Sequence, residues 1–383
     1  MLKRIFQQQK YSTPIRLGVV ACQTGSMASY ARTALQGLKL GLEYATGGTQ
    51  QVAGRTLEII LKDDKGDPHL SDQVARELVQ GGEVDILVGC TSSAAAIKVS
   101  QVARELGKIL VVAVAATDVL TGEWFSRFTF RTVANKSQDA AAGGRYAVER
   151  LGKSFCFIAP DSLWGQQSRA AWWRVITKFK GSIVGDIMAA PDEKDFKSYM
   201  RDIISHSPDV LVASWAGDTT RILLRQMYES GIFKRCKVTG GMTDHENIVA
   251  LGAAVNGMIC ASKYYYEFLH NPVNDWFVAH HQDAFGEPPD LITESGFTAG
   301  LATVCGLEKT SGDPAAEGLI PVMEGMSFDS PKGSFTFRKE DHQGLQPMYV
   351  AELVMDPKRG YCVPRLIHEA SAEDSAPPIV KPR

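Results

Sequence analysis

Two adjacent hydroxyl side chains, Ser92 and Ser93, stand where an apolar strand-like run at 85–89 gives way to a helix-forming segment. A helix start exposes unpaired backbone N–H groups and a partial positive charge, which together stabilise an anion such as a carboxylate. The serine hydroxyls would add further donors. The pattern predicts a carboxylate seat, and the alternative is that the serines only cap the helix; both roles can hold at once.

The motifs of the common enzyme classes are missing. We find no GxGxxG loop, GxSxG elbow, HExxH helix or paired CxxC motifs in the sequence. The segment 152–154 resembles the end of a phosphate loop, but Ala147 occupies the position of the first glycine, and the segment precedes a strand instead of following one. We therefore expect no catalytic residues, no enzyme activity and no cofactor.

Two groups of residues resemble metal ligands but have unsuitable spacing. The neighbours His280 and His281 point about 100° apart on a helix, so they cannot easily bind one ion together. The acidic run 63–67 lacks the spaced ligands of a calcium loop and is better explained as a turn that leads into a helix cap at Asp67. We expect no metal site.

Strand-like and helix-like segments alternate along the chain, which indicates βαβ units and parallel sheets. The first series has strands at 15–21, 57–61, 85–89 and 109–114 with helices at 29–44, 67–82 and 92–106. After residue 132 a second series has strands at 154–158, 182–189, 209–215 and 237–239 with helices at 165–179, 195–206 and 218–230. The end comprises helices at 274–285 and 293–310, then hairpin-like strands at 333–337 and 348–354. Two such series predict two α/β lobes instead of one long sheet.

The composition gives no sign of a nucleic-acid or membrane partner. The chain has 383 residues, 44% of them hydrophobic and 22% charged, with a formal net charge of -2. No block of Lys and Arg offers a surface for nucleic acid, and the longest apolar run, 109–116, is far shorter than the ~20 residues that cross a bilayer. The seven cysteines form no CxxC pair and are expected to be small buried hydrophobic residues.

Several stretches, taken in order, resemble the periplasmic binding proteins of the leucine/isoleucine/valine type, which are receptors of ABC importers. The stretches are 15–18, 24–25, 63–68, 88–93, 115–117, 130–132, 164–165, 208–210, 341–343 and 346–349. The resemblance implies a type I periplasmic binding fold, a venus flytrap of two Rossmann-like lobes joined by three crossovers, with the ligand in the cleft between them.

The resemblance also implies domain limits. Lobe 1 is expected at 14–133 and 266–338, lobe 2 at 134–262 and 342–368, and flexible tails at 1–13 and 371–383. The crossovers are expected near 133–136, 262–266 and 337–342.

The site residues follow from the same resemblance. Ser93 and Thr117, with the backbone of Ala115 and the helix start at Ser92, would hold the carboxylate of the ligand. Loop and strand-end aromatic residues would form the walls, because rigid rings give a large contact area; any one of them could instead belong to the core. These wall residues are Tyr30, Trp164 and Trp215.

One position departs from the amino-acid receptors. Met242 stands where those receptors carry the glutamate that binds the ammonium, although Asp244 could still serve as the counter-ion. A thioether carries no charge, so we predict a carboxylate ligand without an α-ammonium, first an aromatic acid and next a branched 2-oxo acid. The alternative is an amino-acid receptor.

The compartment is left open by the residues themselves. Met1–Phe6 resembles the charged start of a signal peptide, but 7–10 is polar where an apolar segment should follow. Relatives with a disulfide place one cysteine in the 63–68 turn, where this chain has Gly66, so that bridge is expected to be absent. We expect a periplasmic monomer, with its signal peptide removed, that partners an ABC permease; the alternatives are a cytosolic amide-sensing regulator of the same fold and an enzyme with an unrecognised site.

Overall fold

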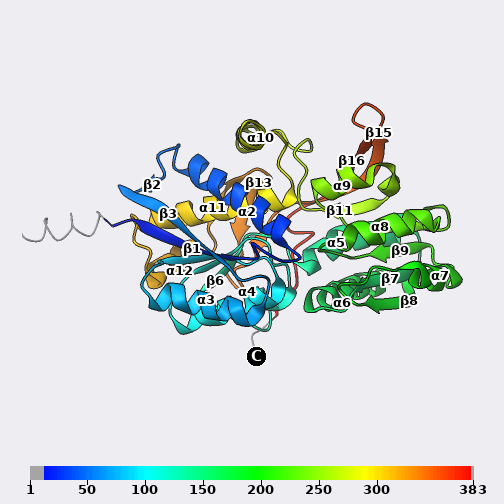
Figure 1. Ribbon diagram of the computed structural model, residues 1–383, viewed down its shortest axis with the longest axis horizontal. Coiled ribbons are helices and arrows are strands. Elements are labelled where there is room, and N and C mark those ends of the chain that lie inside the picture. Colours follow the sequence, from blue (N-terminus) through cyan, green and yellow to red (C-terminus); the bar gives the residue numbers. More distant parts are fainter. Residues whose placement is uncertain (1–12, 381–383) are drawn as a thin grey trace, which may run out of the picture. The chain divides into compact units, whose positions relative to one another are not determined.

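The computed structural model describes residues 13–380, and these form two compact units, each described here by itself (Figure 1). Lobe 1 consists of 13–134 and 269–345, together with 379–380. Lobe 2 consists of 135–268 and 346–378. The expected N-terminal signal and tail at 1–12, and the last residues of the expected C-terminal tail at 381–383, lie outside the described residues.

Lobe 1 contains a six-stranded sheet in the order β2-β3-β1-β4-β5-β6. Its strands are β1 (Ile15–Ala21), β2 (Gln51–Val52), β3 (Arg55–Asp63), β4 (Ile86–Gly89), β5 (Leu110–Val112) and β6 (Thr129–Arg131). All neighbours are parallel except β2 and β3. The parallel strands therefore end at one common edge.

The helices of lobe 1 differ in how they begin, since four of the six α-helices have a side-chain N-cap and two have none. They are α2 (Ala28–Ala45), α3 (Pro68–Gln80), α4 (Ser93–Glu105), α10 (Pro272–Phe285), α11 (Leu291–Lys309) and α12 (Ala316–Met323), with a 3-10 turn η1 (Asp118–Thr121). Asp67 accepts hydrogen bonds from the first turn of α3, which confirms the predicted cap. Helices α2 and α11 touch through backbone: a Cβ on Gly37 would lie 1.8 Å from the Thr293 carbonyl oxygen, so only glycine fits there.

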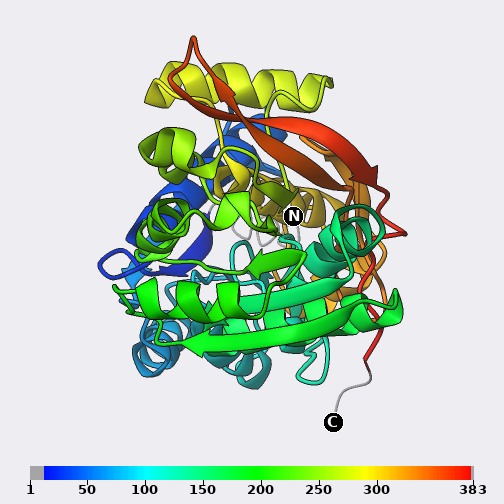
Figure 2. The same cartoon turned by 90° about the vertical axis from the view of Figure 1, so that its right-hand side faces the viewer.

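Lobe 2 contains a seven-stranded sheet in the order β16-β15-β11-β10-β9-β7-β8. Its strands are β7 (Ser154–Pro160), β8 (Ser182–Ala189), β9 (Val210–Ala213), β10 (Lys237–Gly241), β11 (Ile259–Ser262), β15 (Met348–Asp356) and β16 (Tyr361–Ala370). Strands β7 to β11 are parallel, while β15 and β16 form an antiparallel ribbon, the long orange and red pair in Figure 2.

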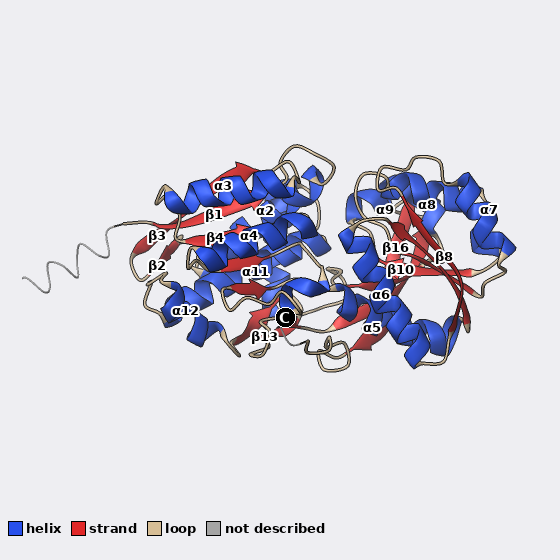
Figure 3. Cartoon of the chain, turned by 90° about the horizontal axis from the view of Figure 1, so that it is seen from below, coloured by secondary structure: helices blue, strands red, loops and turns tan. Residues whose placement is uncertain are grey.

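Helices cover both faces of the lobe 2 sheet (Figure 3). They are α5 (Lys136–Tyr146), α6 (Leu163–Lys178), α7 (Lys197–Ser205), α8 (Thr220–Glu229) and α9 (His245–Leu251), with short helices η2 (Ala147–Leu151), η3 (Ile232–Lys234) and η4 (Gly252–Val255). Alternate residues of β7 serve two cores. Phe155 and Phe157 pack with α5 and α6, whereas Cys156 and Ile158 pack with α7, α8 and α9.

The predicted hairpin near the C-terminus is wrong. A three-stranded antiparallel sheet in lobe 1 contains β12 (Ser327–Ser330), β13 (Gly333–Phe337) and β14 (Gly344–Leu345), whereas β15 pairs with β11 and β16 in lobe 2. Because β14 pairs with β13, the chain leaves lobe 1 only after Leu345, later than the expected crossover at 337–342. The other two passages lie at 134–135 and 268–269.

Part of the expected C-terminal tail is built into lobe 2. Ser375 is fully buried, and its hydroxyl lies 2.9 Å from the Ser371 carbonyl oxygen and 3.4 Å from that of Gln346. The Ser375 backbone N–H also donates to the Ser371 carbonyl. These hydrogen bonds fix a turn directly after β16, which composition alone did not reveal.

None of the seven cysteines, all within residues 13–380, forms a disulfide, and five of them are buried. Over residues 13–380 we find no cluster of three or more His, Cys, Asp or Glu side chains arranged to hold a metal ion. Within the same part of the chain, every helix is too short or too polar to cross a membrane.

Candidate ligand-binding site

The predicted carboxylate seat lies at the edge of lobe 1 where the parallel strands β4 and β5 end side by side. Ser92 and Ser93 follow β4, and Thr117 follows β5. The Ser92 hydroxyl accepts a hydrogen bond from the Ala95 N–H at 3.1 Å, so Ser92 is the N-cap of α4. Ser93 is the first residue of that helix. The N-cap role is therefore confirmed for Ser92, and Ser93 remains available for a ligand.

Two hydroxyls at this edge are buried without a hydrogen-bond partner. Ser93 is 7% exposed and Thr117 is 0% exposed. Neither the Ser93 Oγ nor the Thr117 Oγ1 has a partner among the described residues. A buried polar group left in this state costs ~1–3 kcal/mol, so native proteins rarely leave one without a reason. Two such groups on neighbouring strand ends are typical of a site that a polar ligand completes.

Gly89 lets the chain turn out of β4 into the short loop that leads to Ser92 and Ser93. Its φ is +143°, and a Cβ there would lie 2.3 Å from the Val20 carbonyl oxygen on the adjacent strand β1. No side chain can occupy that space without moving β1. The glycine therefore fixes the place at which the chain leaves the sheet toward Ser92.

A buried arginine holds the loop that carries Thr117. The guanidinium of Arg131, at the end of β6, donates hydrogen bonds to the Thr117 carbonyl and the Thr121 hydroxyl. It also donates to the Gln343 Oε1 at 2.7 Å. These bonds join β6, the loop after β5 and the segment before β14. They fix the backbone of Thr117 in place.

Arg131 entered the sequence analysis only as part of the family stretch 130–132. A charged residue in a run 128–134 that otherwise holds only apolar residues and threonines was the one signal that could have singled it out. Burial lowers the pKa of Arg131 to about 10, while Asp118 and Asp341 act in the opposite direction. The guanidinium therefore keeps its charge at neutral pH.

We expect Arg131→Met to lower the free energy of unfolding by ~2–5 kcal/mol, because the buried Thr117 carbonyl and Thr121 hydroxyl lose the donor that Arg131 supplies, and Gln343 Oε1 keeps the Thr121 hydroxyl as a donor. Ligand affinity should fall as well, since the loop that carries Thr117 loses the hydrogen bond between Arg131 and the Thr117 carbonyl. Urea denaturation followed by circular dichroism measures the first effect. Arg127→Met is the matched control, because the exposed Arg127 makes a surface ion pair with Glu317 and a cation–π contact with Phe128, whose loss should change stability by ~1 kcal/mol or less. Equal stability of the two variants would contradict the positioning role.

Two other predicted residues of lobe 1 are placed differently from expectation. Tyr30 lies in the first turn of α2 and not in the preceding loop, and it is half-buried. The backbone N–H of Ala115 already donates to the Cys90 carbonyl at 3.2 Å. The backbone group that Ala115 could offer a ligand is thus its carbonyl oxygen. A carbonyl accepts hydrogen bonds from a donor and cannot donate one to a carboxylate.

A small apolar cavity of about 20 Å³ lies between α2 and the ends of β1, β4 and β5. Its lining includes Ala31 and Leu38 of α2 together with Cys90 and Thr91, which directly precede Ser92. The predicted carboxylate seat is therefore bordered by apolar side chains where it faces α2.

Four predicted residues lie at the corresponding edge of lobe 2, where β7, β9 and β10 end. Trp164 is the second residue of α6, just after β7, and Trp215 follows β9. The Trp215 indole N–H donates to the Thr219 hydroxyl at 2.9 Å, and its ring packs edge-on against Phe196. Trp215 is therefore anchored on one side by the lobe 2 core and is half-buried.

Met242 and Asp244 follow β10. Met242 is half-buried against the core, and its N–H donates to the Ala261 carbonyl at 2.8 Å. Asp244 caps α9: its carboxylate accepts from the Asn247 backbone N–H at 2.9 Å and from the Asn247 side-chain amide at 2.7 Å. Both Asp244 oxygens thus have local partners, which opposes its use as a ligand counter-ion.

A charged cluster next to Trp164 was not expected. The ammonium of Lys136 lies 4.5 Å from the centroid of the Trp164 ring and pairs with Asp139. Lys263, which follows β11, lies 3.8 Å from the same carboxylate. Sequence reasoning missed the cluster because these residues come together only through the packing of α5 on the sheet.

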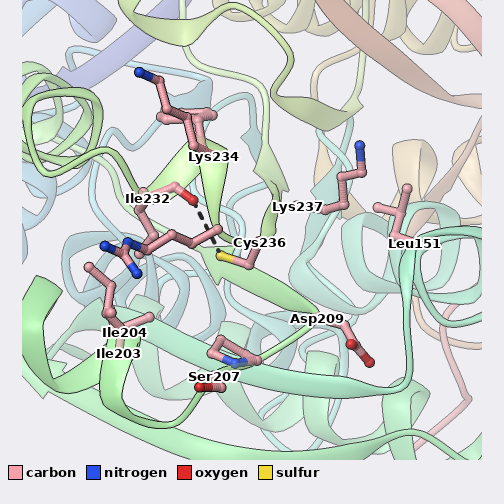
Figure 4. A pocket seen from close by; sticks show the side chains of 12 residues that line it. Leu151, Ile203, Ile204, Ser207, Asp209, Ile232, Lys234, Cys236 and Lys237 are labelled. Atoms are coloured by element: carbon pink, nitrogen blue, oxygen red, sulfur yellow. Dashed lines mark hydrogen bonds between the residues drawn. The ribbon is translucent and has the colours of Figure 1, made fainter.

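A second, wider pocket of about 620 Å³ lies at the opposite edge of the lobe 2 sheet (Figure 4). It is lined by residues at the strand starts, such as Asp209 and Lys237, and by none of the predicted site residues. The Asp209 carboxylate already accepts from the Lys153 and Ser154 N–H groups, which lowers its pKa. The Cys236 thiol, whose pKa burial raises to about 11, contacts the Ile232 carbonyl. These polar groups are locally satisfied.

Comparison with known proteins gives the family. The model of the periplasmic binding protein family matches residues 14–359. The Leu/Ile/Val-binding protein homolog 3 of Brucella melitensis is 25% identical over 327 residues, which cover 84% of this chain and 87% of that protein. A solved structure of an ABC-type branched-chain amino acid transporter from Rhodopseudomonas palustris is 34% identical, with a TM-score of 0.82, and the match covers 96% of this chain and 100% of that one.

A second solved structure, a solute-binding protein of an ABC transporter from R. palustris in complex with benzoate, shares the fold at 24% identity and a TM-score of 0.84, covering 96% of this chain and 98% of that one. These matches confirm the resemblance and the type I periplasmic binding fold. Members of the family bind solutes and are not enzymes. This chain, with its two α/β lobes, accordingly belongs to the periplasmic binding protein family as an ABC-type solute-binding protein.

Proposed function

We propose that this protein is the receptor of an ABC importer and captures a small carboxylate that carries no α-ammonium. The observation that carries the proposal is the pair of buried hydroxyls, Ser93 Oγ and Thr117 Oγ1, without partners among the described residues. Charge-assisted hydrogen bonds to an anion are stronger than neutral ones, so a carboxylate would compensate both hydroxyls best.

The residues after β10 support a ligand that carries no α-ammonium. By the family resemblance Met242 occupies the position of the ammonium-binding glutamate, and a thioether offers no charge. The carboxylate of Asp244 is engaged by Asn247. An ammonium buried without a counter-ion costs ~3–5 kcal/mol, which disfavours a free amino acid.

An aromatic acid is our first choice of ligand, and a branched 2-oxo acid is the second. Tyr30, Trp164 and Trp215 would supply the flat apolar walls. The benzoate-bound R. palustris protein indicates that this fold accommodates an aromatic acid. The names of the B. melitensis and 34%-identical R. palustris relatives favour the alternative, an amino-acid receptor with Asp244 as counter-ion.

We propose a periplasmic protein whose signal peptide has been removed, acting as a monomer with an ABC permease. The membership in the periplasmic binding protein family supports this compartment and partner. Sequencing the start of the gene tests the compartment: a complete signal peptide encoded upstream of Tyr11 would rule out a cytosolic sensor of the same fold.

A thermal-shift screen of the wild-type protein tests the proposal. A ligand present at ~100 times its dissociation constant stabilises the folded state by ~2.7 kcal/mol, which should raise the melting temperature by several degrees. We expect this rise with benzoate, 4-hydroxybenzoate, 4-coumarate or 4-methyl-2-oxopentanoate and no rise with leucine or phenylalanine. A rise with the amino acids alone would point to the alternative, and mass spectrometry after long incubation should return the acid unchanged.

A further inference from the structure

A buried group of charges in lobe 2 has no part in the site described so far. Lys136, Asp139 and Lys263 have side chains that are only 7%, 5% and 14% exposed. The Lys136 ammonium is hydrogen-bonded to the Asp139 carboxylate, and the Lys263 ammonium lies 3.8 Å from it. Removing charged groups from water is unfavourable unless specific partners compensate, so such a cluster calls for a physical reason.

The topology places this cluster at the edge of the sheet that carries the proposed wall. Lys263 follows β11 and Met242 follows β10, and these two strands are parallel neighbours. Trp164 follows β7, which runs parallel to β10 through β9. All these strands end at one edge, where ligands of open α/β sheets bind. Lys136 reaches the same edge from the start of α5, since its ammonium lies over the Trp164 ring.

The chemistry of the Lys136 and Asp139 pair suits one kind of ligand group. An ammonium has three N–H donors, of which Asp139 receives one and the face of Trp164 a second. A hydroxyl on the ligand could accept the third N–H and donate its own proton to Asp139. A second carboxylate could accept from Lys136 too, but it would lie next to the Asp139 carboxylate and be repelled.

We propose that Lys136 and Asp139 form a subsite of lobe 2 that binds a hydroxyl of the ligand. The inference rests on the proposed function and narrows it: the preferred ligands are hydroxylated aromatic acids. Lys136 supplies the donor, Asp139 the acceptor, and Trp164 contacts both the ammonium and the ring of the ligand.

Isothermal titration calorimetry with four acids tests the subsite. The acids are benzoate, 4-methylbenzoate, 4-hydroxybenzoate and terephthalate. 4-Methylbenzoate is about as large as 4-hydroxybenzoate but has a methyl group in place of the 4-hydroxyl. We expect the wild type to bind 4-hydroxybenzoate about 10- to 100-fold more tightly than 4-methylbenzoate, the range of one charge-assisted hydrogen bond. Lys136→Met should abolish this preference while changing the affinity for benzoate only a few-fold.

Two further variants separate recognition from folding. Lys153→Met removes an exposed lysine at the opposite edge of the same sheet and should keep the full preference. Asp139→Asn keeps an acceptor next to Lys136 and should reduce the preference less than Lys136→Met does. Because the wild-type preference is measured directly, the test holds even if a variant folds poorly.

The outcomes also separate the two proposals. Equal wild-type affinities for 4-methylbenzoate and 4-hydroxybenzoate, with benzoate bound, would overturn the subsite and leave the proposed function standing. Tighter binding of terephthalate than of 4-hydroxybenzoate would overturn the assignment to a hydroxyl. If none of the four acids binds to the wild type but 4-methyl-2-oxopentanoate does, the subsite is wrong and the proposed function stands; if that acid does not bind either, both proposals are wrong.

Discussion

Replacing Thr117 with valine is expected to weaken ligand binding about 10- to 150-fold, because a hydrogen bond to a desolvated carboxylate contributes ~1.5–3 kcal/mol. Ser93→Ala should have an effect of similar size. The ligand-free melting temperature should stay the same or rise, since neither hydroxyl has a partner among the described residues that the substitution could remove. Calorimetry of the acid that gives the largest thermal shift measures the affinity, and differential scanning fluorimetry measures the stability.

A matched control should give the opposite pattern. Thr129 is also fully buried in lobe 1, but its hydroxyl is hydrogen-bonded to that of Ser100 at 2.7 Å. Thr129→Val leaves Ser100 without its partner, so it should lower stability by ~1–3 kcal/mol and retain affinity. Unaltered affinity in both Thr117→Val and Ser93→Ala would show that the seat is elsewhere.

The contrast between Ser92 and Arg131 shows what could be predicted from the sequence. Ser92 acts on the Ala95 N–H three residues away, so a local pattern sufficed to predict the cap. Arg131 acts through Gln343, 212 positions further along the chain, and nothing in the local sequence indicates that partner. Lys136 likewise meets Lys263 and Trp164 only because α5 packs on the lobe 2 sheet.

The fold follows the same rule. The alternation of strands and helices predicted the α/β class and the two series of βαβ units, because the strands and helix of each unit follow one another directly in the sequence. The place at which the chain leaves lobe 1 for the last time depends on the pairing of Gly344–Leu345 with β13, and the burial of Ser375 depends on Gln346. Neither contact has a periodic signature, so the hairpin was predicted wrongly and the burial of Ser375 within the expected C-terminal tail was missed.

The second prediction with a large expected effect concerns free amino acids as ligands. We expect leucine and phenylalanine to bind the wild type ~10² to 10⁴ times more weakly than the preferred aromatic acid, because their ammonium would lose its hydration without gaining a counter-ion. Met242 offers only a weakly accepting sulfur, and the oxygens of Asp244 are held by the cap of α9. Calorimetry with leucine, phenylalanine, 4-hydroxybenzoate, 4-coumarate and 4-methyl-2-oxopentanoate measures the difference.

Met242→Glu should then restore measurable leucine binding, since it supplies the missing charge at the end of β10. Met242→Gln is the matched control: it has the same length and polarity without the charge and should leave leucine unbound. Asp244→Ala should weaken the capping of α9 by ~1 kcal/mol and leave the affinity for aromatic acids unchanged. Micromolar or tighter binding of leucine or phenylalanine to the wild type, with no response to the other acids, would mean that Asp244 or another group binds the ammonium and that the amino-acid receptor is the correct function.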